Sequence, residues 1–121
     1  MKIRVYFEDT DIGGIVYHSK YINFCERARS EVLFSNGLSP FNQSTNSGYI
    51  VSSLNCNFHK TATLGDILEV KSRIKTKSRV KFTLLQEIYR DNEKIFSMDI
   101  TLVYLKQGKP AKLEESFLKL F

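Results

Sequence analysis

The sequence predicts an α+β domain in which one long helix covers one face of an antiparallel sheet. Residues 2–7 alternate apolar and polar side chains, and a segment with helical periodicity follows from about His18 to Asn36. Four further strand-like runs come next, without another long helical segment between them. Helices that gather on one face of an antiparallel sheet define the α+β class. With 121 residues in the chain, we expect one domain over residues 1–121.

The composition is that of a soluble globular protein, with 42% hydrophobic and 26% charged residues. No apolar run approaches the roughly 18 residues of a membrane span, and the first residues lack the apolar stretch of a signal peptide. We therefore expect a cytoplasmic protein that does not span a membrane, with Cys25 and Cys56 as reduced thiols. The net charge of +5 permits binding of a phosphorylated small molecule. The like charges form no long run, so we expect no nucleic-acid partner.

The helical segment has one apolar face and a clear end. Its apolar stripe is surrounded by polar and charged residues and consists of Tyr21, Phe24, Cys25, Ala28 and Val32. Gly37 is well placed as the C-terminal cap, and Pro40 prevents an easy restart of the helix. Residues 8–14, which precede the helix, are dense in acids and glycine and are predicted to form a loop.

The remaining residues predict an antiparallel sheet that leaves an edge unprotected. After a polar loop at 38–47, strands are expected at 48–59, 67–76, 79–90 and 94–105, and the tail at 113–121 fits either a short helix or an extended piece. An 18-residue helix and an eight-residue strand are each about 27 Å long, so the helix can lie along the sheet. One helix cannot protect every edge, and pairing with a second copy is the natural remedy.

The residues with chemical potential lie in the loop and at the start of the helix. Glu8, Asp9 and Asp11 are followed by two glycines and then by the predicted helix start. A helix N-terminus exposes unpaired N–H groups, which suit the oxyanion that develops on a thioester carbonyl. A carboxylate beside it can act as a nucleophile or as a general base. Taken alone, however, loop acids are more often capping or solvated groups than catalytic ones.

Two motifs give these residues a more specific interpretation. The chain resembles the YbgC branch of the 4-hydroxybenzoyl-CoA thioesterase family in Val5-Tyr6-x-Glu8-Asp9-Thr10-Asp11-x-x-Gly14-x-Val16-Tyr17-His18-x-x-Tyr21-x-x-x-x-Glu26-Arg27-Ala28-Arg29-x-Glu31. The segment Phe58-x-x-x-Ala62-x-Leu64-Gly65-Asp66 resembles that branch's second landmark. The resemblance implies a hotdog fold, in which a five-stranded antiparallel sheet wraps around one long central helix. It also implies a homodimer or a dimer of dimers, and hydrolysis of acyl-CoA to a free acid and CoA.

The resemblance also implies roles for single residues. Asp11 is expected to be the catalytic carboxylate, as nucleophile or general base, and His18 to lie at the helix start that polarises the carbonyl. Gly14 and Tyr17 are expected at the substrate, and no metal or cofactor is expected. Relatives differ at Phe7, where some carry a tyrosine, and at Thr61, where many carry a proline and where we expect a looser turn.

Other polar residues are weighed against plainer roles. Lys77, Arg79 and Lys81 form a basic cluster that either binds the phosphates of CoA or is a solvated turn. Glu26 lies about 12 Å along the helix from His18, so an ion pair with a neighbouring arginine, Arg27 or Arg29, is favoured over catalysis. His59 is expected at an exposed strand end, and Cys25 in the core.

Three other functions have different consequences. The Asp9-x-Asp11 pair after a strand resembles haloacid-dehalogenase-like phosphatases, but Gly13 and the antiparallel strand order argue against it. A hotdog protein that only binds acyl chains or serves as a scaffold is a second alternative, because a fold does not establish turnover. A thioesterase acting on acyl carrier protein is a third, because the net positive charge suits an acidic carrier protein.

Overall fold

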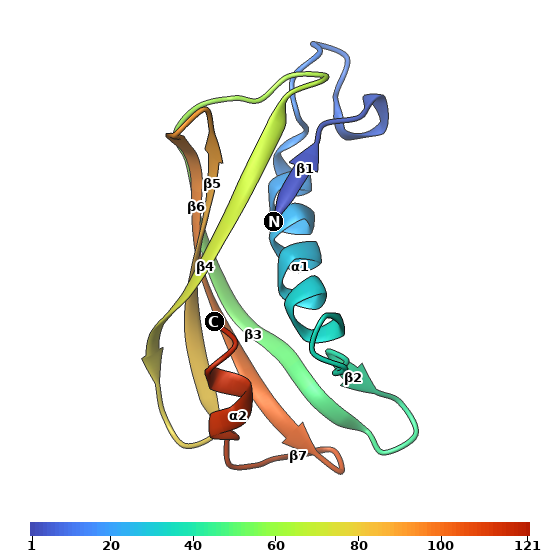
Figure 1. Ribbon diagram of the computed structural model, residues 1–121, viewed down its shortest axis with the longest axis vertical. Helices are drawn as coiled ribbons and strands as arrows, with labels where there is room; N and C mark the ends of the chain where they lie inside the picture. Colours follow the sequence, from blue (N-terminus) through green and yellow to red (C-terminus); the bar gives the residue numbers. More distant parts are fainter.

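A computed structural model describes residues 1–121, and its central feature is a curled antiparallel sheet that lies against one long helix (Figure 1). The helix is α1 (His18–Phe34), and the long strands are β3 (Ser47–Phe58), β4 (Ile67–Lys77), β5 (Lys81–Arg90) and β6 (Glu93–Lys106). The short elements are β1 (Lys2–Arg4), the 3-10 turn η1 (Phe7–Asp9), β2 (Phe41–Asn42), β7 (Lys109–Pro110) and α2 (Glu115–Leu118). The strand order is β1-β4-β5-β6-β3-β2, and β7 pairs with β6.

The sequence therefore predicted the long elements and the α+β class correctly. The sheet has seven strands instead of five, because β2 and β7 are two additional strands of two residues each. The first strand is shorter than expected and ends at Arg4, because the chain then turns into η1. The polar loop 38–47 contains β2, and the tail folds into α2. Neither helix is both long and apolar enough to cross a membrane.

The core lies between α1 and the concave face of the sheet. The helix contributes Tyr21, Phe24, Cys25, Ala28 and Leu33, and the central strands contribute Phe82, Leu84, Ile88, Phe96, Met98, Ile100 and Leu102. Val32, expected in the stripe, is only half-buried, whereas Leu33 is buried and shares a cavity wall with Phe117. Burial raises the pKa of the Cys25 thiol to about 12, so this cysteine is an inert core residue as predicted.

One polar side chain, Gln86, lies fully buried in this core and has partners for its whole amide. Its nitrogen donates to the carbonyl of Cys25 and to the hydroxyl of Ser72, both at 3.0 Å. Its oxygen accepts from Arg29 at 2.8 Å. The expected ion pair of Glu26 with a neighbouring arginine is therefore wrong. Arg29 points inward to Gln86, and Glu26 accepts a hydrogen bond from Ser30.

The two ends of α1 differ in how their backbone groups are capped. At the C-terminal end, Gly37 has φ 73° and donates to Phe34, while Leu38 donates back to Leu33. This is the Schellman arrangement, and it confirms the predicted glycine cap. At the N-terminal end, α1 begins at His18 directly after the loop that contains η1. Figure 1 places this loop at the opposite end of the molecule from α2 and β7.

Strand β3 leaves most of one edge unpaired. The two-residue β2 covers only Ser47 and Gly48, whereas β3 continues to Phe58. Exposed apolar side chains follow along this open part: Ile50, Val51, Leu54 and Phe58. A long edge with exposed apolar residues is a template for pairing with another chain.

Candidate active site

The loop that carries Asp11 is a tight hairpin. Thr10 pairs with Val16 as an antiparallel bridge, and the Asp11 N–H donates to the Ile15 carbonyl at 2.9 Å. Gly14 closes the turn by donating to the Asp11 carbonyl at 3.0 Å. Its φ of 81° lies in the left-handed region, which favours glycine. Asp11 is thus held at the base of a short turn, next to the strand that leads into α1.

The Asp11 side chain is exposed and keeps one oxygen free. Its Oδ1 accepts the Gly13 N–H at 2.8 Å, whereas its Oδ2 has no hydrogen-bond partner in the chain. The side chain borders an open concavity of about 560 Å³. The walls of this concavity are Phe7, Glu8, Thr10, Asp11, Ile12, Gly14 and Leu64. A carboxylate with one anchored and one free oxygen has a fixed direction of attack.

The start of α1 has no side-chain cap. Tyr17 occupies the N-cap position with an extended backbone, and its side chain makes no capping hydrogen bond. The backbone N–H groups of His18 and Ser19 have no acceptor within the chain. The His18 side chain is exposed, with its ring centroid 4.4 Å from that of Tyr17. These donors, together with the partial positive charge of the helix end, are available to an external oxygen.

Asp9 is a buried residue that links the loop to the start of α1. Only 1% of this residue is exposed, its Oδ2 accepts the Tyr6 N–H at 2.9 Å, and its carbonyl accepts the Tyr17 N–H at 2.9 Å. Its Oδ1 makes no hydrogen bond and lies 3.8 Å from the ammonium nitrogen of Lys20. Asp9 therefore shapes the loop by accepting backbone hydrogen bonds.

The segment 61–66 supports the side of this hairpin that leads into α1. Thr63 bridges Ile15, and the Ala62 carbonyl accepts the Val16 N–H at 2.9 Å. The Ala62 N–H donates to the Tyr21 hydroxyl at 3.0 Å, so the same segment also contacts the first turns of α1. Burial raises the pKa of Tyr21, and this phenol stays protonated at neutral pH.

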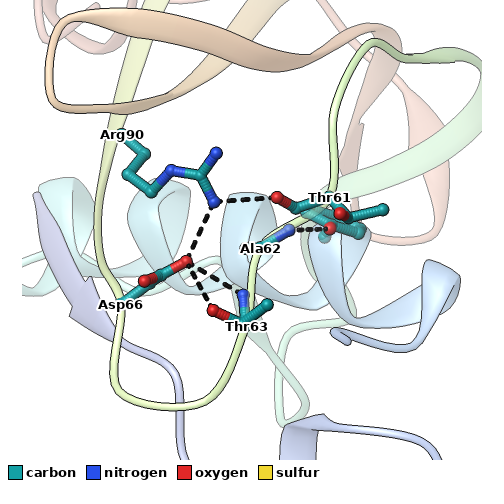
Figure 2. Close-up of polar contacts among 6 residues, drawn as sticks. Thr61, Ala62, Thr63, Asp66 and Arg90 are labelled. Carbon is teal, nitrogen blue, oxygen red and sulfur yellow. Dashed lines mark hydrogen bonds and ion pairs between the residues drawn. The ribbon is translucent and has the colours of Figure 1, made fainter. Parts of the chain in front are cut away.

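An ion pair holds the segment 61–66 in its turn (Figure 2). Arg90 donates from Nη1 to the Thr61 carbonyl at 2.8 Å and to Asp66 Oδ2 at 2.9 Å. The same Asp66 oxygen accepts from the backbone and the hydroxyl of Thr63. Burial alone would raise the pKa of Asp66, but the bonds from Thr63 and Arg90 outweigh it and lower that pKa. The looser turn expected at Thr61 is therefore not found, because Arg90 holds its carbonyl.

Four of the residues expected in the site lie in one continuous segment, and three do not. Asp11 and Gly14 belong to the hairpin, and Tyr17 and His18 form the helix start that directly follows it. The basic cluster of Lys77, Arg79 and Lys81 lies at the end of β4 that is remote from the hairpin. The 11 residues of β4 span about 35 Å. Lys77 lies 3.6 Å from Glu115 of α2. Within one protomer these lysines and Arg79 do not approach Asp11.

Sequence reasoning missed several residues around Asp11. Leu64 and Ile12 line the concavity and are strongly exposed. Arg90 was not considered, because its partner Asp66 is 24 residues away and only the pairing register of β4 with β5 brings the two together. The antiparallel pairing of two predicted strands was the signal that could have found this contact. His59 is exposed, and its Nε2 lies 3.1 Å from the Ser97 hydroxyl. It makes no hydrogen bond to Asp11.

Comparison with known proteins gives matches over most of the chain. A family model of the thioesterase superfamily matches residues 13–97, beginning two positions after Asp11. The acyl-CoA thioesterase YbgC of Helicobacter pylori (strain ATCC 700392 / 26695) is 43% identical over 89 residues, which are 74% of this chain. That match spans 65% of the relative, slightly less than two thirds of its length.

A second relative and a solved structure match nearly end to end. The acyl-CoA thioester hydrolase YbgC of Escherichia coli O6:H1 is 30% identical over 123 residues, which cover 98% of this chain and 92% of that protein. The crystal structure of a probable thioesterase from Bartonella henselae has a TM-score of 0.84 and 28% sequence identity. The superposition covers 94% of this chain and 97% of that one.

Proposed function

Because this chain belongs to the thioesterase superfamily and has the hotdog fold that its resemblance to the YbgC branch implied, we propose that it hydrolyses acyl-CoA thioesters to a free acid and CoA. The observation that carries the proposal is that the hairpin with Asp11 leads directly into the uncapped start of α1. The carboxylate keeps Oδ2 free, and the helix offers the N–H groups of His18 and Ser19. A thioester hydrolase needs this combination of one carboxylate and one oxyanion site.

In the proposed reaction, the thioester carbonyl oxygen accepts a hydrogen bond from the His18 N–H. Charge that develops on this oxygen in the tetrahedral intermediate is stabilised by the helix end. Asp11 then has two routes. In the first, Oδ2 attacks the carbonyl carbon, the C–S bond breaks with release of the CoA thiolate, and water hydrolyses the mixed anhydride. In the second, Oδ2 takes a proton from a water molecule, which attacks the carbonyl carbon directly. The C–S bond then breaks as the tetrahedral intermediate collapses, and the CoA thiolate leaves with the proton that Asp11 had taken.

The neighbours of Asp11 have supporting roles in this proposal. Gly14 lets the backbone approach the substrate closely, and the exposed ring pair of Tyr17 and His18 contacts the thioester arm. Phe7 offers an apolar wall where some relatives offer a phenol, and Leu64 extends that wall. We expect the acyl or pantetheine part of the substrate to lie on this apolar surface.

A second copy of the chain is part of the proposal. The open edge of β3, with its exposed apolar side chains, suits antiparallel pairing with the β3 strand of another protomer. Lys77, Arg79 and Lys81 are too far from Asp11 of their own protomer. Contact between this basic cluster and CoA phosphates therefore requires another protomer in a dimer or a dimer of dimers.

We predict that Leu54→Lys weakens association of the protomers by at least about tenfold, because it places a charge on the apolar edge that the partner covers. Sedimentation equilibrium over a range of protein concentrations measures the dissociation constant. Ile67→Lys is the matched control, since Ile67 is 42% exposed, against 43% for Leu54, but lies on a strand at the other side of the sheet. Equal effects of the two substitutions would contradict association through β3.

The test of the function itself is a hydrolysis screen. Acetyl-, butyryl-, octanoyl-, palmitoyl- and benzoyl-CoA are offered to the purified chain, and the free thiol of CoA is measured. We predict that at least one ester reaches a kcat/KM of about 10⁴ M⁻¹ s⁻¹ or more. Binding of these esters without turnover would support the acyl-binding or scaffold alternative and overturn the enzymatic proposal.

The identity of the thioester carrier is the second question in the same screen. The chain has a net charge of +5, which also suits an acidic acyl carrier protein. Each acyl group is therefore offered on CoA and on acyl carrier protein at equal concentrations. Faster turnover on the carrier protein, with a rate that falls steeply as salt is added, would favour the carrier-protein alternative.

A further inference from the structure

The segment 61–66 connects two parts of the proposed active site that are separate in the sequence. Its Asp66 carbonyl accepts the Val5 N–H at 2.9 Å, and its Gly65 N–H donates to the Val5 carbonyl at 3.0 Å. These two bonds fix the chain just before η1, which leads into the Asp11 hairpin. Ala62 and Thr63 fix the side of the hairpin that leaves toward α1, through Val16 and Ile15. Movement of the segment 61–66 would therefore move the chain on both sides of the Asp11 loop.

The same segment sets the position of the helix start. Val16 lies two residues before His18, and its N–H is held by the Ala62 carbonyl. The Ala62 N–H in turn binds the hydroxyl of Tyr21, one turn into α1. The placement of the Asp11 hairpin relative to the helix start thus depends on this six-residue turn, which contains no catalytic group, as well as on the direct bond from the Tyr17 N–H to the Asp9 carbonyl.

The Asp66–Arg90 ion pair is the only salt bridge made by this turn, which also accepts a hydrogen bond from Arg4 at the Gly65 carbonyl. Arg90 reaches from the end of β5 to the Thr61 carbonyl, at the start of the segment, and to the Asp66 carboxylate, at its end (Figure 2). Thr63, between them, donates two hydrogen bonds to the same carboxylate oxygen. The two charged side chains are 25% and 24% exposed. They are therefore better shielded from water than an ordinary surface pair.

We propose that Asp66 and Arg90 are positioning residues for the thioesterase reaction, which clamp the turn 61–66 and so hold Asp11 at a fixed distance from the start of α1. This inference rests on the proposed function for its effect on turnover. The clamp itself is a property of the fold, and its effect on the backbone can be measured without any substrate.

The test compares the parent chain with Asp66→Asn, Arg90→Gln and the double variant. We expect each single variant to lower kcat about ten- to a hundredfold, with KM changed less than about threefold, because a displacement of about 1 Å misaligns the reacting groups. The double variant should be no slower than the slower single variant, since both substitutions release the same turn. Arg90→Lys keeps the charge but replaces the rigid, planar group whose Nη1 binds both Thr61 and Asp66 by a flexible ammonium, and should keep only part of the rate.

Glu93→Gln is the matched control. Glu93 pairs with Lys60 at 2.7 Å, beside the same turn, but the two side chains are 48% and 57% exposed, and they bind no atom of the segment 61–66. We expect this variant to keep the parent kcat. If Asp66→Asn keeps the parent kcat and only its urea midpoint falls, the ion pair is merely structural and the proposal is wrong.

Amide hydrogen exchange separates failure of the clamp from failure of the proposed function. In Asp66→Asn, the Val5 and Val16 amides should exchange at least about tenfold faster than in the parent, while the amide of Met98 in the core should change only with global stability. If the parent chain hydrolyses no thioester but this exchange pattern is found, the clamp stands and the proposed reaction does not. Unchanged exchange at Val5 and Val16 would overturn the clamp whatever the activity.

Discussion

Replacement of Asp11 by Asn is expected to lower kcat for acyl-CoA hydrolysis by a factor of about 10³ or more. The amide is nearly the same size as the carboxylate and can still accept the Gly13 N–H, so the turn should keep its shape. It can neither attack the carbonyl carbon nor take a proton from water. The substrate should therefore still bind, with KM or Kd within a few-fold of the parent value.

Steady-state kinetics and calorimetric binding of a non-hydrolysable thioether analogue measure these two effects. Glu8→Gln is the comparison within the same loop, since Glu8 is also exposed but makes no hydrogen bond to the turn. We expect it to change kcat less than about threefold. A full rate for Asp11→Asn, or equal losses in the two variants, would show that the catalytic carboxylate is wrongly assigned.

The role of Asp11 follows from a separate measurement on the parent. Rapid quenching during a single turnover, followed by mass spectrometry of the peptide that contains Asp11, detects an acyl adduct if the carboxylate is the nucleophile. Oxygen-18 from labelled water should then enter the product acid only after the adduct has formed. With Asp11 as general base, no adduct forms at any time and the label enters in the first bond-making step.

Replacement of Phe96 by Ala is expected to have the largest effect on stability, with a loss of about 3–5 kcal/mol in the free energy of unfolding. Phe96 is fully buried on β6. Its ring stacks on Tyr21 of α1 with centroids 5.3 Å apart, and it meets Phe58 of β3 edge-on at 5.2 Å. The alanine leaves a cavity between helix and sheet that this rigid aromatic cluster cannot fill.

Urea unfolding followed by circular dichroism measures the loss. Phe96→Leu is the control, because leucine keeps most of the volume, and it should cost about 1–1.5 kcal/mol. The alanine variant should also loosen the hydrogen bond between the Tyr21 hydroxyl and Ala62, since the ring of Tyr21 loses its support. A loss below about 1 kcal/mol for Phe96→Ala would mean that the core collapses around the cavity and that the stacking contributes little.

The sequence carried enough information for the long elements but not for the short ones. The helical stripe of α1 and the alternation in β4 to β6 are periodic signals over ten or more residues. Strands β2 and β7 are two residues long, and they are strands only because they pair with β3 and β6. The turn η1 replaces the end of the first strand because the Asp9 carboxylate binds the Tyr6 N–H, a local contact that alternation does not reveal.

The candidate site was predictable to the same partial degree. Asp11 and His18 are near each other in the sequence, and their motif identified both. The free Oδ2 of Asp11 and the bare start of α1 could not be inferred, since they depend on which hydrogen bonds the folded chain leaves unmade. Arg90 depends on strand register, and the separation of the basic cluster from Asp11 within one protomer depends on the length of β4.

Because the start of α1 is uncapped, folding stability and catalytic turnover make opposite demands on position 17. Ser, Asp or Asn at an N-cap typically adds about 1 kcal/mol of stability over a residue without a capping oxygen. Here Tyr17 forgoes that gain. A capping oxygen at this position would bind the Ser19 N–H, one of the two donors that the proposed reaction offers to the thioester, and would place negative charge density next to the His18 N–H. Selection for heat resistance alone would therefore drive this helix start toward a better-folded but poorer enzyme.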